Sequence, residues 1–170
     1  MTITPTAIEA AGLCAYLTML AGLVAFAIYD IRTKRVPNMG LALFVPIVLA
    51  CTILRCMAES WDSPLFYALY SVAGAVAGGG VLLAAALATK GGIGGGDIKL
   101  AALIGLFYGP HGMLLALLTG TPIAIFYGLI KRRRCGDKKL HIAFVPFITI
   151  GCFLTSIILV KGAYLSLIHI

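Results

Sequence analysis

Long apolar runs, separated by short polar or glycine- and proline-rich stretches, dominate the chain. Each run is rich in Leu, Ile, Val, Ala and Phe and holds few charged side chains. A helix needs about 20 such residues to cross the ~30 Å hydrocarbon core of a bilayer. The runs therefore predict an all-α, polytopic membrane protein with six transmembrane helices in a single domain, residues 1–170. The expected helices cover residues 8–28, 39–57, 65–89, 98–108, 113–130 and 142–160.

The fourth run is shorter than the others because residues 109–112 (Gly-Pro-His-Gly) follow it, and glycine and proline favour a turn. A helix from Asp97 to Tyr108 rises only ~18 Å at 1.5 Å per residue. So short a helix must be shielded by its neighbours or line a water-filled recess. Treating residues 98–118 as one span instead leaves residues 121–130 too short to cross, so six spans are preferred.

Composition also favours a membrane location. The chain is 61% hydrophobic and 11% charged, whereas a soluble domain is typically about 45–50% apolar and about 25% charged. The net charge of +7 would suit a nucleic-acid binder, but in so apolar a chain it is more typical of loops on the cytoplasmic side. We therefore expect no nucleic-acid partner.

Positive charge is distributed unevenly between the two sides of the predicted bundle. With six spans, eleven of the 13 Lys and Arg residues fall on one side, which predicts that this side faces the cytoplasm and that both termini are extracytoplasmic. Such loops fix topology and attract anionic lipid headgroups. The eleven are Arg32, Lys34, Arg35, Lys90, Lys99, Lys131, Arg132, Arg133, Arg134, Lys138 and Lys139, whereas Arg55 and Lys161 fall on the other side.

The cysteines do not suggest a cofactor. They form no CxxC pair, so neither a zinc site nor a redox motif is predicted. We expect them to pack as small apolar residues, and we expect no metal and no other cofactor. They are Cys14, Cys51, Cys56, Cys135 and Cys152.

Two aspartates lie at the edges of apolar runs on the predicted cytoplasmic side. Asp30 ends the first helix, where a carboxylate opposes the helix dipole at a cost of roughly 0.3–1 kcal/mol, although Arg32 and Arg35 could compensate. Asp97 starts the fourth helix, where Asp is a favoured N-cap. Taken singly, each residue has a structural explanation, an ion pair or a cap.

Taken together, the two aspartates suggest chemistry. If the first and fourth helices pack together, the two carboxyl groups cannot both ionise comfortably and share a proton. Such a pair suits general acid–base hydrolysis of a peptide bond, and Gly94 and Gly96 would let an extended peptide approach Asp97. Carboxylates at membrane depth also carry protons or cations, so a small transporter or assembly subunit remains an alternative.

Two sequence motifs resemble those of a known family. Residues 94–97 (Gly-Gly-Gly-Asp) match the GxGD motif of membrane aspartic proteases. The longer stretch 94–100 (Gly-Gly-Gly-Asp-Ile-Lys-Leu) resembles that of type IV prepilin peptidases. Residues 30–38, an Asp followed by a Val-Pro-Asn turn, resemble the other signature of that family.

The resemblance implies an aspartic endopeptidase of the bacterial inner membrane that cleaves the leader of prepilins or pseudopilins at the cytoplasmic face. In this reading Asp30 and Asp97 form the catalytic dyad, and no cofactor is needed. The resemblance also implies that Gly94 and Gly96 shape the glycine loop and that Pro37 and Asn38 shape the turn into the second span. Arg32 and Lys99 match family positions too, and extension of their side chains to the lipid headgroups explains them as well as a role in tuning the dyad.

The chain also departs from the larger family members. It lacks their cytoplasmic insertion with paired CxxC motifs, so no methyltransferase activity is expected, and it is similar to the short peptidases of tight-adherence (Flp-type) pili. Residues 142–147 match only part of the family pattern Ile-Pro-Phe-Gly/Ala-Pro, because Ala143 and Val145 differ. A presenilin-like or signal-peptide-peptidase-like protease shares GxGD and is a further alternative, but the turn after Asp30 and the short length fit it less well.

Overall fold

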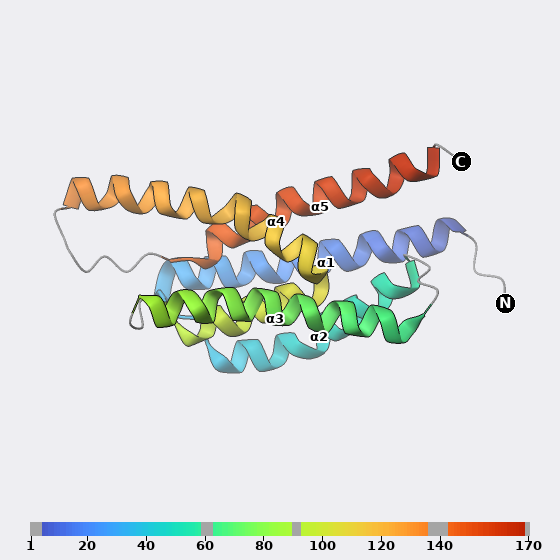
Figure 1. Ribbon diagram of the computed structural model, residues 1–170, viewed down its shortest axis with the longest axis horizontal. Coiled ribbons are helices and arrows are strands. Elements are labelled where there is room, and N and C mark those ends of the chain that lie inside the picture. Colours follow the sequence, from blue (N-terminus) through green and yellow to red (C-terminus); the bar gives the residue numbers. More distant parts are fainter. Residues whose placement is uncertain (1–4, 59–62, 90–92, 136–142, 169–170) are drawn as a thin grey trace.

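Five α-helices form the computed structural model, which describes residues 5–58, 63–89, 93–135 and 143–168 (Figure 1). Within these residues all regular secondary structure is helical, which confirms the all-α prediction. The helices are α1 (Pro5–Thr33), α2 (Asn38–Ala58), α3 (Pro64–Ala88), α4 (Gly95–Cys135) and α5 (Val145–Ile168).

The helices have the length and surface of membrane-spanning segments. Their outward faces remain apolar, and Leu43, Leu87 and Leu118 are each at least 70% exposed. Apolar surface on this scale is rare on soluble monomers, but it suits contact with lipid. The chain is therefore a membrane protein. Among the residues whose side chains the structure describes, four stretches are long and apolar enough to cross, Ala10–Thr33, Asn38–Met57, Pro64–Ala88 and Gly95–Lys131, and α5 contributes the apolar stretch Val145–Leu159.

Helix α4 is interrupted at Gly109, whose φ of 72° and ψ of 177° are not helical. Glycine adopts a positive φ at little cost, whereas a residue with a Cβ atom rarely does. The break falls within the turn predicted at residues 109–112. It divides α4 into a first half, residues 95–108, and a second half, residues 110–135.

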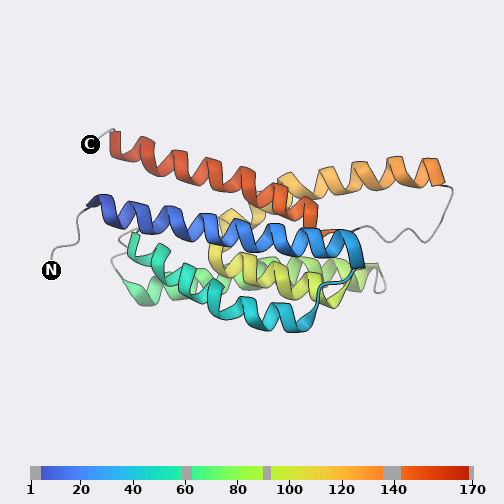
Figure 2. The same cartoon turned by 180° about the vertical axis from the view of Figure 1, so that it is seen from behind.

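The two halves of α4 run in opposite directions (Figures 1 and 2). The first half begins beside the α1–α2 connection, where Gly96 lies against Val36. The second half returns to the same end of the bundle, where Lys131 lines a pocket together with Lys34. The first half is thus the short helix expected after Asp97, and its neighbours cover it.

Glycines allow the two halves of α4 to approach other helices closely. A Cβ atom at Gly74 on α3 or at Gly105 on α4 would collide with the backbone of the other helix, and one at Gly78 would meet the Ala101 carbonyl. On the second half, a Cβ atom at Gly120 would meet the backbone of α5 at Phe147. Close backbone approach at small residues of this kind is typical of helix association in membranes.

A buried arginine secures the end of the first half of α4. Arg55 is only 5% exposed, and its guanidinium donates a hydrogen bond to the Phe107 carbonyl. It also lies over the rings of Tyr16 and Phe107, 5.5 Å and 5.6 Å from their centroids. The last carbonyls of a helix lack partners within it, so a cation there satisfies them and complements the dipole. Arg55 therefore stabilises the helix end just before Gly109.

The described Lys and Arg residues other than Arg55 gather at one end of the bundle. Arg32 and Lys34 lie at the C-terminal end of α1, and Lys131 reaches the same pocket as Lys34. Lys99 lies on the first turns of α4 beside Asn38. Predictions for Lys90, Lys138 and Lys139, and for the side chains of Arg132, Arg134 and Lys161, concern parts of the chain outside the described residues.

Candidate active site

Asp30 lies in the last turn of α1 and is 4% exposed. Its carboxylate accepts hydrogen bonds from the backbone N–H of Val145, at 3.1 Å, and from that of Phe144. Helix α5 begins at Val145, so these donors belong to groups that a helix start leaves without partners. Asp30 therefore caps α5 from another helix.

This cap explains why an acid is tolerated at the end of α1. The α1 dipole disfavours a carboxylate there, but the N-terminus of α5 favours it. We expected Arg32 or Arg35 to compensate, and that expectation is wrong within the described residues. Both arginine side chains are exposed, and the groups that satisfy Asp30 are backbone donors of α5.

Asp97 lies in the first turn of α4, as its third residue. The Asp97 and Ile98 N–H groups donate to the Gly94 carbonyl, at 3.1 Å and 3.4 Å, which makes Gly94 the N-cap. The prediction that Asp97 itself is the N-cap is therefore wrong. Its carboxylate instead accepts a hydrogen bond from the Gly94 N–H, the return contact of a capping box.

Contacts between the two sequence motifs bring Asp30 and Asp97 to the same place. A Cβ atom on Gly96 would lie 2.8 Å from the Val36 Cβ and 2.9 Å from the Val36 carbonyl oxygen, so only glycine fits there. The two carboxyl groups lie close enough for their charges to interact. The α1–α2 connection and the start of α4 thus form one unit around the two aspartates.

The neighbouring predicted residues contribute unequally to this unit. Lys99 Nζ donates a 3.1 Å hydrogen bond to Asn38 Oδ1, which ties α4 to the start of α2. The Pro37 carbonyl accepts the Leu41 N–H at 3.1 Å and so belongs to the first turn of α2. Arg32 is exposed in the last turn of α1, and the described structure gives it no contact with either aspartate.

Gly94 leaves the Asp97 carboxylate uncovered. A Cβ atom at residue 94 would lie 3.3 Å from Asp97 Oδ2, which is tighter than ordinary contact. Asp97 is half-buried, whereas Asp30 is buried. Asp97 is therefore the more exposed residue of the pair.

The partial match of residues 142–147 to the family pattern left open which part α5 takes in this site. Phe144 and Val145 act through backbone N–H groups, so their side chains carry no signal of the contact. The available signal was Pro146, because proline is typical of the first turn of a helix and marks the free N–H groups just before it.

Such a pair of carboxyls can perform acid–base chemistry. Two neighbouring carboxyl groups in apolar surroundings can hold one proton between them, which provides an acid and a base in the same site. Among the described residues no group of three or more His, Cys, Asp or Glu side chains could hold a metal ion. Cys14, Cys51, Cys56 and Cys152 are free thiols.

Comparison with known proteins identifies the family. No curated protein and no solved structure matches the chain. A family model described as the type IV leader peptidase family matches residues 17–129, a region that holds both aspartates. The match covers more than half of the chain and runs from within α1 to the second half of α4. The chain is therefore a member of the type IV leader peptidase family.

Proposed function

We propose that this protein is a membrane-embedded aspartic endopeptidase that removes the leader peptide of type IV prepilins or pseudopilins. Membership of the family supports a prepilin-type peptidase. The observation that carries the aspartic mechanism is the close contact of Gly96 with Val36, which brings the end of α1 with Asp30 and the start of α4 with Asp97 together. No methyltransferase activity belongs to the proposal.

In the proposed reaction the two carboxyls divide the proton transfers. The ionised carboxyl takes a proton from water as the water oxygen attacks the scissile carbonyl carbon, and the protonated carboxyl donates to the carbonyl oxygen. Collapse of the tetrahedral intermediate breaks the C–N bond, and the amine leaves with a proton from the dyad. The open approach beside Gly94 would admit the extended peptide to Asp97.

We place the site at the cytoplasmic face of the bacterial inner membrane. The described start of α1 and end of α5 lie at one end of the bundle, and the basic residues Arg32, Lys34 and Lys131 lie at the other (Figure 2). Counting the two halves of α4 separately gives six passes, with both termini extracytoplasmic and the basic end inside. In this orientation the basic loops fix topology and bind anionic lipid.

The family match favours this proposal over its rivals. A small transporter or assembly subunit would use Asp30 and Asp97 as a proton or cation site, but the matched family is one of peptidases. A presenilin-like protease would share the GxGD motif, but the matched family is that of type IV leader peptidases.

Processing in cells tests the proposal. The chain is co-expressed with a prepilin-like substrate, and cleavage is followed by the mobility of the pilin band. We expect Asp30→Asn and Asp97→Asn each to abolish processing at membrane levels equal to wild type. Asp137→Asn, the same chemical change in a predicted cytoplasmic loop, should leave processing intact. Normal processing by either dyad variant would reject the aspartic mechanism.

A further inference from the structure

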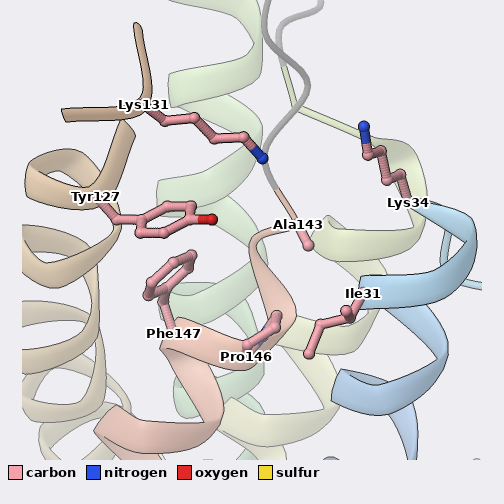
Figure 3. Close-up of a pocket in the computed structure, with 7 residues that line it drawn as sticks. All are labelled: Ile31, Lys34, Tyr127, Lys131, Ala143, Pro146 and Phe147. Carbon is pink, nitrogen blue, oxygen red and sulfur yellow. The ribbon is translucent and has the colours of Figure 1, made fainter. Parts of the chain in front are cut away.

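A pocket of about 260 Å³ opens beside the candidate active site, between the end of α1, the second half of α4 and the start of α5 (Figure 3). The two lysines of the pocket approach it from opposite sides, one from α1 and one from α4. The catalytic proposal uses none of its side chains. The lining residues are Ile31, Lys34, Tyr127, Lys131, Ala143, Pro146 and Phe147.

The pocket combines a cationic rim with an aromatic and apolar wall. The rings of Tyr127 and Phe147 lie 5.4 Å apart at an angle of 44°. Lys131 Nζ lies 5.6 Å from the centroid of the Tyr127 ring, which holds this ammonium group beside the opening through a cation–π contact. Ile31 and Pro146 complete the apolar side. A ligand with an anionic head next to an apolar body matches this arrangement.

Lys34 adopts a backbone conformation that favours glycine. Its φ is 52°, and its N–H closes the last turn of α1 on the Asp30 carbonyl at 2.7 Å. Glycine is the usual residue at this position after a helix, because a Cβ atom is disfavoured there. Non-glycine residues in this region gather at ligand sites, where the side chain has a task that offsets the strain. The Lys34 side chain is therefore the feature to explain.

The position of Lys34 and Lys131 relative to the hydrocarbon core of the membrane indicates which kind of anion they bind. Lys34 follows the last residue of α1, and Lys131 is the first of four consecutive basic residues that end the apolar run of α4. Both ammonium groups thus lie where the hydrocarbon core gives way to water, which is the level of the lipid phosphates.

We propose that this pocket is a discrete binding site for the headgroup of an anionic phospholipid. The phosphate lies between the Lys34 and Lys131 ammonium groups, and the acyl chains follow the exposed apolar surface that begins at Ile31. Two cations and no acidic side chain among the lining residues select a net negative headgroup over a zwitterionic one. Lipid binding does not depend on the peptidase proposal.

The site has a direct structural connection to Asp30. Ala143 and Pro146 line the pocket, and they flank Phe144 and Val145, whose N–H groups bind the Asp30 carboxylate. A bound headgroup would therefore hold the start of α5 against the end of α1. An effect of the bound lipid on catalysis through Asp30 rests on the proposed function, whereas lipid binding itself does not.

Lipid retention by the purified, full-length protein tests the proposal. Native mass spectrometry compares phosphatidylglycerol with phosphatidylcholine, each added to the protein in detergent. We expect the Lys34→Gly/Lys131→Gln variant to bind phosphatidylglycerol on the order of tenfold more weakly than wild type, since each lysine contributes through charge. Lys34→Gly keeps the helix end and relieves its strain, so loss of folding does not obscure the result. Arg133→Gln removes an exposed charge from α4 outside the pocket and is the matched control.

Several results would overturn this assignment. Equal weakening in the double variant and in Arg133→Gln would mean a diffuse charge effect, and equal retention of the two lipids by wild type would mean no headgroup selection. Competition by millimolar inorganic phosphate would identify a free-phosphate site. Unchanged lipid binding with a raised KM for a prepilin peptide would assign the pocket to the substrate instead.

Discussion

The carboxylate of Asp30 and the backbone N–H of Val145 join α1 to α5 through a 3.1 Å hydrogen bond. The bond satisfies a free donor at the start of one helix with an acid from the end of another. It also fixes the rotamer of a proposed catalytic carboxyl through a third element of the fold. A change in α5 should therefore affect catalysis without touching either aspartate.

Removing the Val145 donor should lower activity more than trimming the Val145 side chain. Val145→Pro deletes the N–H at the first position of α5, where proline is tolerated in a helix. A hydrogen bond to a charged group contributes roughly 1.5–3 kcal/mol, so kcat should fall about 10- to 100-fold. Val145→Ala keeps the N–H and is the control. Equal losses in the two variants, measured on purified protein with a prepilin peptide, would show that the bond does not matter for the reaction.

A methyl group at Gly96 should separate the two sequence motifs. In Gly96→Ala the new Cβ atom meets the Cβ atom and the carbonyl oxygen of Val36, so the start of α4 must move away from the α1–α2 connection. We expect peptidase activity to fall at least about tenfold, because a displacement of about 1 Å at a catalytic group costs on the order of 100-fold. Gly95→Ala places its Cβ atom in open space and should be nearly normal. The two variants are compared at equal protein concentration, and similar activities would contradict the packing described.

Close packing between α3 and α4 should be sensitive to single methyl groups. Gly74→Ala and Gly105→Ala each push a Cβ atom into the backbone of the facing helix, and overpacking of this kind costs roughly 1–3 kcal/mol. Gly80→Ala, also on α3, faces open space and is the control. Thermal unfolding in detergent should show lower Tm values for the first two variants only. A Tm of Gly80→Ala as low as that of Gly74→Ala would refute this explanation.

Neutralising the basic cluster at residues 132–134 should disturb membrane insertion rather than chemistry. Positive charge near a span end sets orientation, so Arg132→Gln/Arg133→Gln/Arg134→Gln should lower the level of correctly inserted protein. Topology is read by labelling introduced cysteines from either side of the membrane. Activity per inserted molecule should stay within about twofold of wild type, because none of these arginines takes part in the proposed proton transfers. Loss of cleavage in a correctly inserted, abundant variant would contradict the topological role.

The fold was predictable where the length of an apolar run, or a glycine or proline, determines the structure of its own segment. The runs at residues 39–57 and 65–89 correspond closely to α2 and α3, and the turn predicted at residues 109–112 contains the break at Gly109. Glycine and proline restrict or release the backbone through their own covalent structure, so their effect is visible in sequence.

Contacts between helices were less predictable. The sequence identified Asp30 and Asp97, but not that Asp30 caps α5, because the donors there are backbone groups that every residue except proline carries. The cap of α4 was misplaced by three residues, since Asp97 and Gly94 exchange roles in a capping box. The pocket between α1, α4 and α5 combines residues distant in the chain, and no local pattern indicates it.

The most direct test of the central claim is the kcat of the purified enzyme with a synthetic prepilin peptide for Asp30→Asn, Asp97→Asn and the double variant. If the two carboxyls act as one unit, each single change removes the acid–base pair, and kcat falls on the order of 100- to 10,000-fold. The double variant should then be no slower than the slower single variant, because residues that act together are not additive. Single variants that retain substantial activity, or losses that multiply in the double variant, would contradict the dyad.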